Sequence, residues 1–178
     1  MHSYLQRVQQ AIDEGVRGLS LEQLAWHREG KWSAAAILEH LSLTYSGTAK
    51  GLQRGLDAGQ PNITPPSTRQ RVASFVVTTL RYMPPGRKAP AMVVPKVASP
   101  ETVLADVRRN LIAADDAISR CEALFGAGAS IANHPILGPL TARQWRTFHL
   151  VHARHHMKQI ARIRQQIAAE TRAAAAHG

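Results

Sequence analysis

Hydrophobic side chains recur every three or four positions along most of the chain, which is the spacing of an amphipathic helix. The first stretch with this pattern covers residues 3–17, and its apolar positions are Leu5, Val8, Ile12 and Val16. Gly18 then weakens the pattern. The leucines that follow predict a short turn before the next element.

The second long helix has a defined start. Ser33 is a natural N-cap because its hydroxyl can accept a hydrogen bond from a free amide of the first turn. Trp32, just before it, can pack against Ile37 as a hydrophobic staple. One side of this helix carries Ile37, Leu38, Leu41, Tyr45 and Leu52. The glycines at positions 55 and 59 predict its end.

Two more long helices are predicted in the second half of the chain. One runs from about Pro100 to Phe125, with Ser99 as its N-cap. The last begins after Thr141 and runs to about Ala168 or beyond. Its inner stripe consists of Trp145, Phe148, His149, His152, His156, Ile160 and Ile163. We expect residues 171–178 to form a frayed tail.

Residues 60–100 are rich in proline and form the least regular part of the chain. We predict a short helix from about Thr68 to Tyr82, followed by an irregular excursion. The excursion either shapes a pocket at one end of the helices or is a plain surface connection. No alternating pattern of useful strand length is present. Long amphipathic helices with few strands predict an all-α fold, a four-helix bundle, as a single domain over residues 1–170.

The length of 178 residues fits one domain with its own hydrophobic core. The single cysteine, Cys121, excludes an internal disulfide and a cysteine-only metal cage, and we expect it to be a small core residue. The first ten residues lack the apolar region of a signal peptide. No apolar run approaches the roughly 20 residues of a membrane helix. We therefore expect a cytoplasmic protein that does not enter membranes.

The formal net charge of +10 suggests nucleic acid or an anionic small molecule as a partner. The basic residues are scattered rather than gathered in one arm, and aromatic residues make up only 5% of the chain. Few base-stacking platforms are therefore available. The sequence disfavours nucleic acid and leaves an anionic small molecule or a plain basic surface.

Histidine is the residue type that suggests chemistry, since the chain has nine of them. His152 and His156 are four positions apart on one predicted helix, so both rings can point at one spot, as metal ligands do. His40 lies beside the inner face of the second long helix, where a buried imidazole needs a partner. We predict that these three residues form a metal site. His149, one turn before His152, is a less suitable third ligand, and His155 should lie nearer the helix edge.

The spacing differs from the metalloprotease motif, because the residues between His152 and His156 include no glutamate. Three neutral imidazoles leave the ion its full charge and open positions, which is typical of catalytic sites. Zn or Ni is the first choice of metal, with Fe and Mn as alternatives.

No catalytic residue can be named from the sequence, but three residues could support the ligands. Gln159 could orient a metal-bound water, or it could be an ordinary amide at the helix edge. His134 could lie near the open end of the bundle, or it could be an exposed loop histidine. His149 is the third candidate.

Several segments resemble the DinB/YfiT-like superfamily of metalloenzymes. They are Lys31-Trp32-Ser33, Ile37-Leu38-Glu39-His40-Leu41 and the stretch from His152 to Ile160. The segment from His134 to Thr141, with Gln144-Trp145 and Phe148-His149, resembles a branch catalogued as a domain of unknown function. The resemblance covers residues 20–165. It implies an up-down-down-up four-helix bundle, often dimeric, with His40, His152 and His156 as ligands. It also implies thiol-dependent transferase or isomerase activity, with low-molecular-weight thiols such as bacillithiol or mycothiol.

Three functions follow from these observations as hypotheses. The first is a metal-dependent enzyme, a transferase, isomerase or hydrolase acting on a small molecule such as a thiol, and working as a homodimer. The second is a non-catalytic metal-binding bundle that serves dimerisation or a stress response. The third, disfavoured by the scattered charge, is a basic nucleic-acid-binding module.

Overall fold

The computed structural model describes residues 1–86, 88–96 and 99–176 and is mostly helical. The first half contains α1 (Ser3–Val16), α2 (Leu21–Ala25), α3 (Ala34–Asp57), α4 (Thr68–Ser74) and the π-helical turn η1 (Phe75–Thr79). The second half contains the 3₁₀ turn η2 (Ala91–Val93), α5 (Val103–Phe125), the strands β1 (Ser130–His134) and β2 (Gly138–Thr141), and α6 (Ala142–Ala175).

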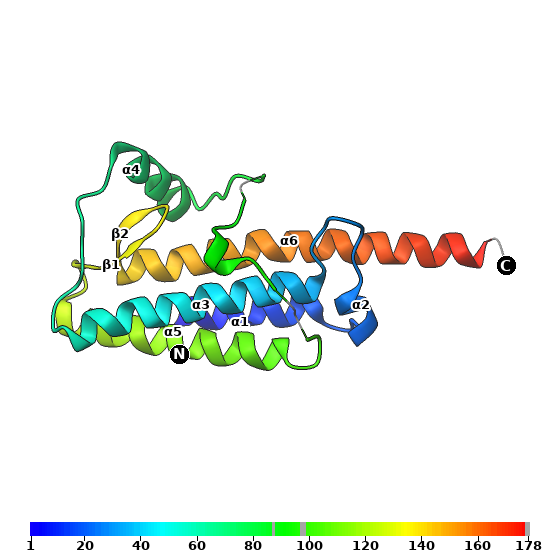
Figure 1. Cartoon of the computed structure of the whole chain (residues 1–178), viewed down its shortest axis with the longest axis horizontal. Coiled ribbons are helices and arrows are strands. Elements are labelled where there is room, and N and C mark those ends of the chain that lie inside the picture. Colours follow the sequence, from blue (N-terminus) through cyan, green and yellow to red (C-terminus); the bar gives the residue numbers. More distant parts are fainter. Residues whose placement is uncertain (87, 97–98, 177–178) are drawn as a thin grey trace.

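Four long helices, α1, α3, α5 and α6, lie side by side (Figure 1). The colours show that α1 and α6 run in one direction and that α3 and α5 run in the opposite one. The most extensive packing joins α3 to α5 and α1 to α6. Each helix buries the apolar stripe that its sequence predicts, with Leu5, Leu38, Leu111 and Ile160 all at most 1% exposed. Cys121 is also fully buried in this core, as expected.

Helix starts follow the predicted caps in α3 but not in α5. The Ser33 hydroxyl accepts from the amide of Ala36 at 3.0 Å, which confirms this residue as the N-cap of α3. The start predicted at Pro100 was wrong, because α5 begins at Val103 with Thr102 in the N-cap position. The Ser99 hydroxyl donates to the Glu101 carboxylate at 2.6 Å instead of capping a helical amide. Residues 99–102 therefore form a turn before the helix.

A two-stranded antiparallel hairpin, β1 and β2, lies in a region where the sequence predicted no strand. The strands are short, the register is interrupted between Ser130 and Ala132, and Pro139 lies inside β2, so no clear alternation marks them. Gly138 has a positive φ of 73°, and a Cβ at this position would lie 3.3 Å from side-chain atoms of Gln70 and Pro66. Glycine is therefore needed both for the turn and for the close approach of α4.

The proline-rich segment returns over the face formed by α3 and α6 (Figure 1). The helix predicted to reach Tyr82 is α4 continued by η1, and it ends at Thr79. Arg81 then adopts a φ of 54°, which turns the chain out of the helical path. The rest of the segment approaches α3 again at η2, so it contributes to a site rather than to a plain surface connection.

Helix α6 extends past the rest of the fold and continues as far as Ala175, through most of the predicted tail. Residues 177–178, at the end of that tail, lie outside the described residues. Among the described helices, none combines the length and the apolar character that crossing a bilayer requires.

Candidate metal centre

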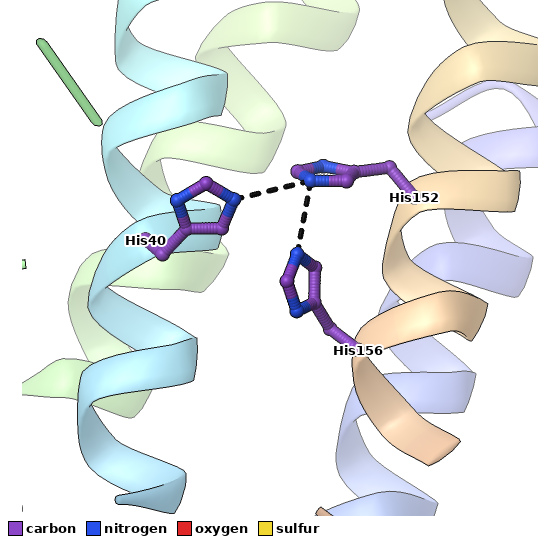
Figure 2. A group of neighbouring side chains, drawn as sticks. All are labelled: His40, His152 and His156. Atoms are coloured by element: carbon purple, nitrogen blue, oxygen red, sulfur yellow. Dashed lines mark hydrogen bonds between the residues drawn. The ribbon is translucent and has the colours of Figure 1, made fainter. Parts of the chain in front are cut away.

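Three buried histidines from two antiparallel helices point their rings at one spot (Figure 2). His152 Nε2 lies 3.1 Å from His40 Nε2 and 3.0 Å from His156 Nε2. The exposed fractions of the three residues are 4% for His40 and 7% for each of the other two. The structure therefore brings together the three histidines that the sequence predicted as metal ligands, although His40 on α3 is 112 positions before His152 on α6.

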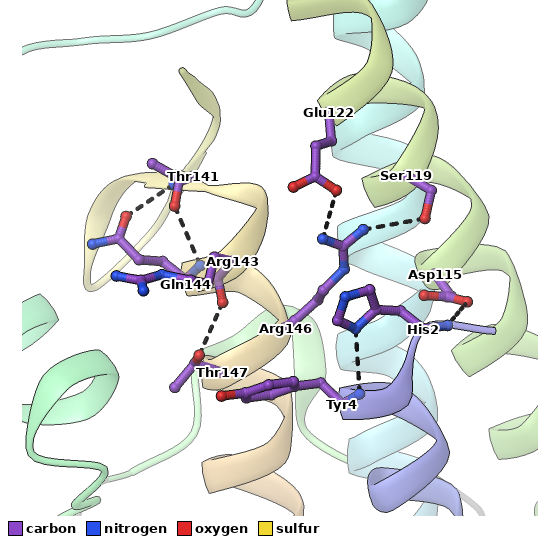
Figure 3. Close-up of polar contacts among 10 residues, drawn as sticks. All are labelled: His2, Tyr4, Asp115, Ser119, Glu122, Thr141, Arg143, Gln144, Arg146 and Thr147. Carbon is purple, nitrogen blue, oxygen red and sulfur yellow. Dashed lines mark hydrogen bonds and ion pairs between the residues drawn. The ribbon is translucent and has the colours of Figure 1, made fainter. Parts of the chain in front are cut away.

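The start of α6 is firmly fixed, which places two of the three rings (Figure 3). Thr141 and Gln144 form a capping box, in which the Thr141 hydroxyl accepts from the Gln144 amide and the Gln144 side chain accepts from the Thr141 amide. One turn later, buried Arg146 donates to the Glu122 carboxylate of α5 at 2.6 Å and to the Ser119 hydroxyl at 3.2 Å. These contacts anchor the helix before His152 is reached.

The outer ring nitrogens of two ligands have partners that set their protonation. His40 Nδ1 lies 2.7 Å from the carbonyl oxygen of Val93, which can only accept, so this nitrogen carries the hydrogen. His156 Nδ1 lies 2.8 Å from Oε1 of Gln159 and also donates. In neutral rings, the Nε2 atoms of His40 and His156 are then unprotonated, and each carries a lone pair.

Those two lone pairs face the same atom, His152 Nε2, and one hydrogen on that atom cannot serve both. At least one of the two short N···N separations therefore has no proton between its nitrogens. A cation would interact favourably with all three lone pairs at once. Metal-bound histidines commonly donate their other nitrogen to a carbonyl or a side chain in this way.

The dimensions of the cluster suit a transition metal. The three candidate ligand atoms all lie within 4.8 Å of one another. Two imidazole nitrogens bound to Zn at about 2.1 Å lie about 3.4 Å apart in tetrahedral geometry and about 3.0 Å apart at a right angle. The two short separations therefore require little change for an ion to bind.

Burial keeps the three rings neutral, which is the ligand form. It lowers the pKa of His156 to about 4 and that of His152 well below the ordinary value, with the neighbouring histidines adding to both effects. Burial also lowers the pKa of His40, and the hydrogen bond to Val93 opposes this shift.

His149 does not join the cluster. It is fully buried against Tyr45 and Trp145, with ring centroids 5.1 and 5.9 Å away, and neither of its nitrogens has a described partner. Burial lowers its pKa to about 3. His152 Nδ1 likewise has no partner among the described residues. Phe148 stacks on the ring of His152 at 5.3 Å and holds it by packing instead.

His134 and Gln159 both line the cleft and have hydrogen-bond partners. His134 is half-buried rather than an exposed loop residue, and its Nδ1 accepts from the amides of Ile136 and Leu137 in the hairpin turn. Gln159 holds the ring of His156, and its Nε2 lies 3.3 Å from Nε2 of His155. The side chain of Gln159 therefore contacts a candidate ligand directly, so it is more than an amide at the helix edge.

A family profile described as "Protein of unknown function (DUF1569)" matches residues 5–163. The chain belongs to the DUF1569 family. The matched range includes all three histidines and Gln159. No curated protein and no solved structure matches the chain.

In this DUF1569 chain, the histidine cluster opens into a cleft of about 1500 Å³. The cleft is lined by residues of the loop before α3, of α3, α6 and the hairpin, and by described residues between α4 and Val94. Within that last segment, the carbonyl oxygen of Val93 accepts from His40, and Arg81 donates to the hydroxyl of Tyr4 at 3.3 Å. The role of Val93 could not be predicted from the sequence, because any residue type has a backbone carbonyl.

Proposed function

We propose that this DUF1569 protein is a metal-dependent enzyme in which His40, His152 and His156 hold a divalent cation, with Zn or Ni as the first choice. The observation that carries this proposal is that the three Nε2 atoms converge on one buried spot beside a cleft. Two of them are held unprotonated by the hydrogen bonds at Nδ1 of the same rings. A divalent cation there would supply Lewis-acid chemistry to a substrate oxygen or thiol.

We further propose that the fold is the four-helix bundle of the DinB/YfiT-like superfamily. The directions of the four long helices support this, since they follow the up-down-down-up order (Figure 1). The positions of the histidines, one on the second long helix and two on the last, support it as well. A thiol-dependent transferase or isomerase is then the expected enzyme class.

The chain's own residues would bind and orient the reactants. Val93 and Gln159 fix the tautomers of two ligands before any ion arrives, so less reorganisation is needed on binding. The ring centroid of Trp32 lies 5.3 Å from that of His40, and the ring of Phe148 stacks on that of His152. Aromatic rings therefore exclude water from two sides of the site. Among the described residues that line the cleft there is no carboxylate, so histidines rather than acids are available to move protons.

Elemental analysis of the purified protein tests the metal site. We expect about one metal ion per chain in the wild type and almost none in His40→Ala and His156→Ala, because removing one of three ligands leaves an incomplete site. The matched control is His27→Ala, which removes an exposed histidine and should keep the metal. A wild-type protein that takes up no metal after incubation with Zn or Ni would overturn the proposal.

A second measurement separates an enzyme from a non-catalytic metal-binding bundle. In the cobalt-substituted protein, a low-molecular-weight thiol should change the visible spectrum, because an open ligand position accepts it. An unchanged spectrum with a range of thiols and oxyanions would contradict a catalytic site and favour the non-catalytic bundle.

A further inference from the structure

The charges around the cleft are of one sign. Its lining includes six basic residues, and no Asp or Glu occurs among the lining residues that the structure describes, although the chain contains 12 acids. The basic residues are Arg28, Lys31, Arg54, Arg69, Lys88 and Arg162, all with exposed side chains. A cleft lined by one sign of charge attracts ligands of the opposite sign.

Most of these cations are available for a ligand. Within the described part of the chain, Arg28 alone of the six has an ion pair within 4 Å, to Glu170 at 3.6 Å. Arg54 and Arg69 have none. A cation without an internal partner can pair with a bound anion without first breaking a bond.

The cleft also has an apolar wall on one side of the histidine cluster. Val72 and Val76 of α4 and η1, together with Trp145 and Phe148 of α6, line it. Val72 is 60% exposed, so a large apolar side chain faces solvent at the cleft. Apolar surface of this kind, joined to a cleft, is typical of a binding site.

The apolar wall leads to Arg54 and Arg69. Trp145 and Phe148 precede His152 on α6, and α6 runs antiparallel to α3, so this end of α6 lies along the end of α3 that carries Arg54 (Figure 1). Arg54 follows His40 by almost four helical turns, which is about 20 Å along the axis. Along α4 and η1, Arg69, Val72 and Val76 have three- and four-residue spacing, and all three line the cleft.

We propose that the cleft binds an elongated amphipathic organic anion. Its carboxylate or phosphate group pairs with Arg54 and Arg69, and its apolar body lies along Val72, Val76, Trp145 and Phe148. Its far end then reaches the three histidines, and in this respect the assignment as a substrate rests on the proposed function. Arg28, near the opposite end of the cleft, is already paired with Glu170, whereas Arg54 and Arg69 have no ion pair among the described residues.

Fluorescence titration with three dansyl probes tests this. They are a dansyl-labelled fatty acid, its methyl ester and dansylglycine, which separate the contributions of charge and chain. We expect the fatty acid to bind at least tenfold more tightly than the ester or the short anion. An ester that binds as tightly as the acid would overturn the proposal. Competition by an alkyl phosphate and by a fatty acid then shows which anionic group is preferred.

Paired charge variants locate the anionic end. Arg54→Ala/Arg69→Ala should weaken binding of the fatty acid about three- to tenfold and leave the ester unchanged. The matched control is Lys50→Ala/Arg71→Ala, which removes two exposed charges from the same helices at positions outside the cleft lining. Equal weakening in both pairs would mean a general effect of net charge and would contradict the assignment.

The wild-type protein made metal-free with a chelator separates this proposal from the previous one. It should still bind the fatty acid with the same selectivity, since the arginines and the apolar wall remain. Probe selectivity in a wild-type protein that binds no metal would overturn the metal-dependent enzyme alone. Stoichiometric metal without probe selectivity would overturn the amphipathic ligand alone.

Discussion

The carbonyl oxygen of Val93 lies 2.7 Å from Nδ1 of His40, a residue 53 positions earlier in the chain. This one hydrogen bond joins the proline-rich segment to α3 and at the same time directs the lone pair of His40 toward the other two histidines. The irregular part of the chain and the candidate metal centre are therefore one structural unit.

If His40 holds this segment in place, His40→Ala should release it. We expect faster hydrogen exchange at the amides of Val93 and Val94, which otherwise close the 3₁₀ turn to Pro90 and Ala91. Exchange in α5 should stay as in the wild type. Mass spectrometry of peptic fragments measures both regions, and His27→Ala is the control. Unchanged protection around Val93 would show that the segment is held by other contacts.

Gln159 should set the metal affinity through His156. Gln159→Leu removes the acceptor at His156 Nδ1 and should weaken metal binding by about 10- to 100-fold in competition with a chelator. Gln159→Glu keeps an acceptor and should bind metal within a few-fold of the wild type. The control is Gln166→Leu, which changes another amide that lines the cleft on α6. Equal affinities in Gln159→Leu and Gln166→Leu would refute a role for Gln159.

Acid should destabilise the metal-free protein through His149. Burial lowers the pKa of this residue to about 3 in the folded state, whereas the unfolded chain protonates near the ordinary value of about 6.5. The unfolded state therefore binds more protons between these values, and the free energy of unfolding falls as the pH drops below about 6.5. His134, with a folded pKa of about 4, acts in the same direction.

Urea unfolding with a chelator, at pH 7 and pH 5, measures this effect. Over the whole range, His149 can account for a loss of up to about 5 kcal/mol. His149→Phe should reduce the difference between the two pH values, because the buried titrating group is gone. His27→Phe, at an exposed position, serves as the control. A His149→Phe protein with the pH dependence of the wild type would contradict this assignment.

The buried ion pair between Arg146 and Glu122 should contribute to stability (Figure 3). Their side chains are 5% and 30% exposed, so removing Arg146 leaves a partly buried carboxylate without its partner. We expect Arg146→Ala to lower the free energy of unfolding by about 2–3 kcal/mol. Arg146→Met should cost less, since it keeps much of the apolar stem.

The control for that prediction is Arg109→Ala, which removes one side of the exposed pair with Asp106. It should change the free energy of unfolding by less than about 1 kcal/mol. If Arg146→Ala lowered the free energy of unfolding by as little as Arg109→Ala, burial would add nothing to the ion pair between α5 and α6.

Local patterns were enough to predict the helices. The apolar spacing in α1, α3, α5 and α6 depends only on the 3.6-residue period, and the caps at Ser33 and Thr141 depend only on neighbouring residues. Ser99 shows the limit of such patterns, because a hydrogen bond to Glu101 competed with the expected cap. The hairpin was missed because its strands are short and show no clear alternation, and because it packs at Gly138 against Gln70, which is far away in the sequence.

For the candidate site, the sequence alone determined that His152 and His156 share a helix face and that His40 faces inward. These conclusions follow from helical periodicity, which acts over a few residues. Tertiary structure alone decided that His40 meets the other two, that His149 packs against Tyr45 instead, and that a carbonyl of η2 fixes the tautomer of His40. The cleft likewise depends on where the proline-rich segment returns. The sequence identifies the chemistry of each side chain. The contacts of a backbone carbonyl and the distance between two helices are instead set by the packing of the whole chain.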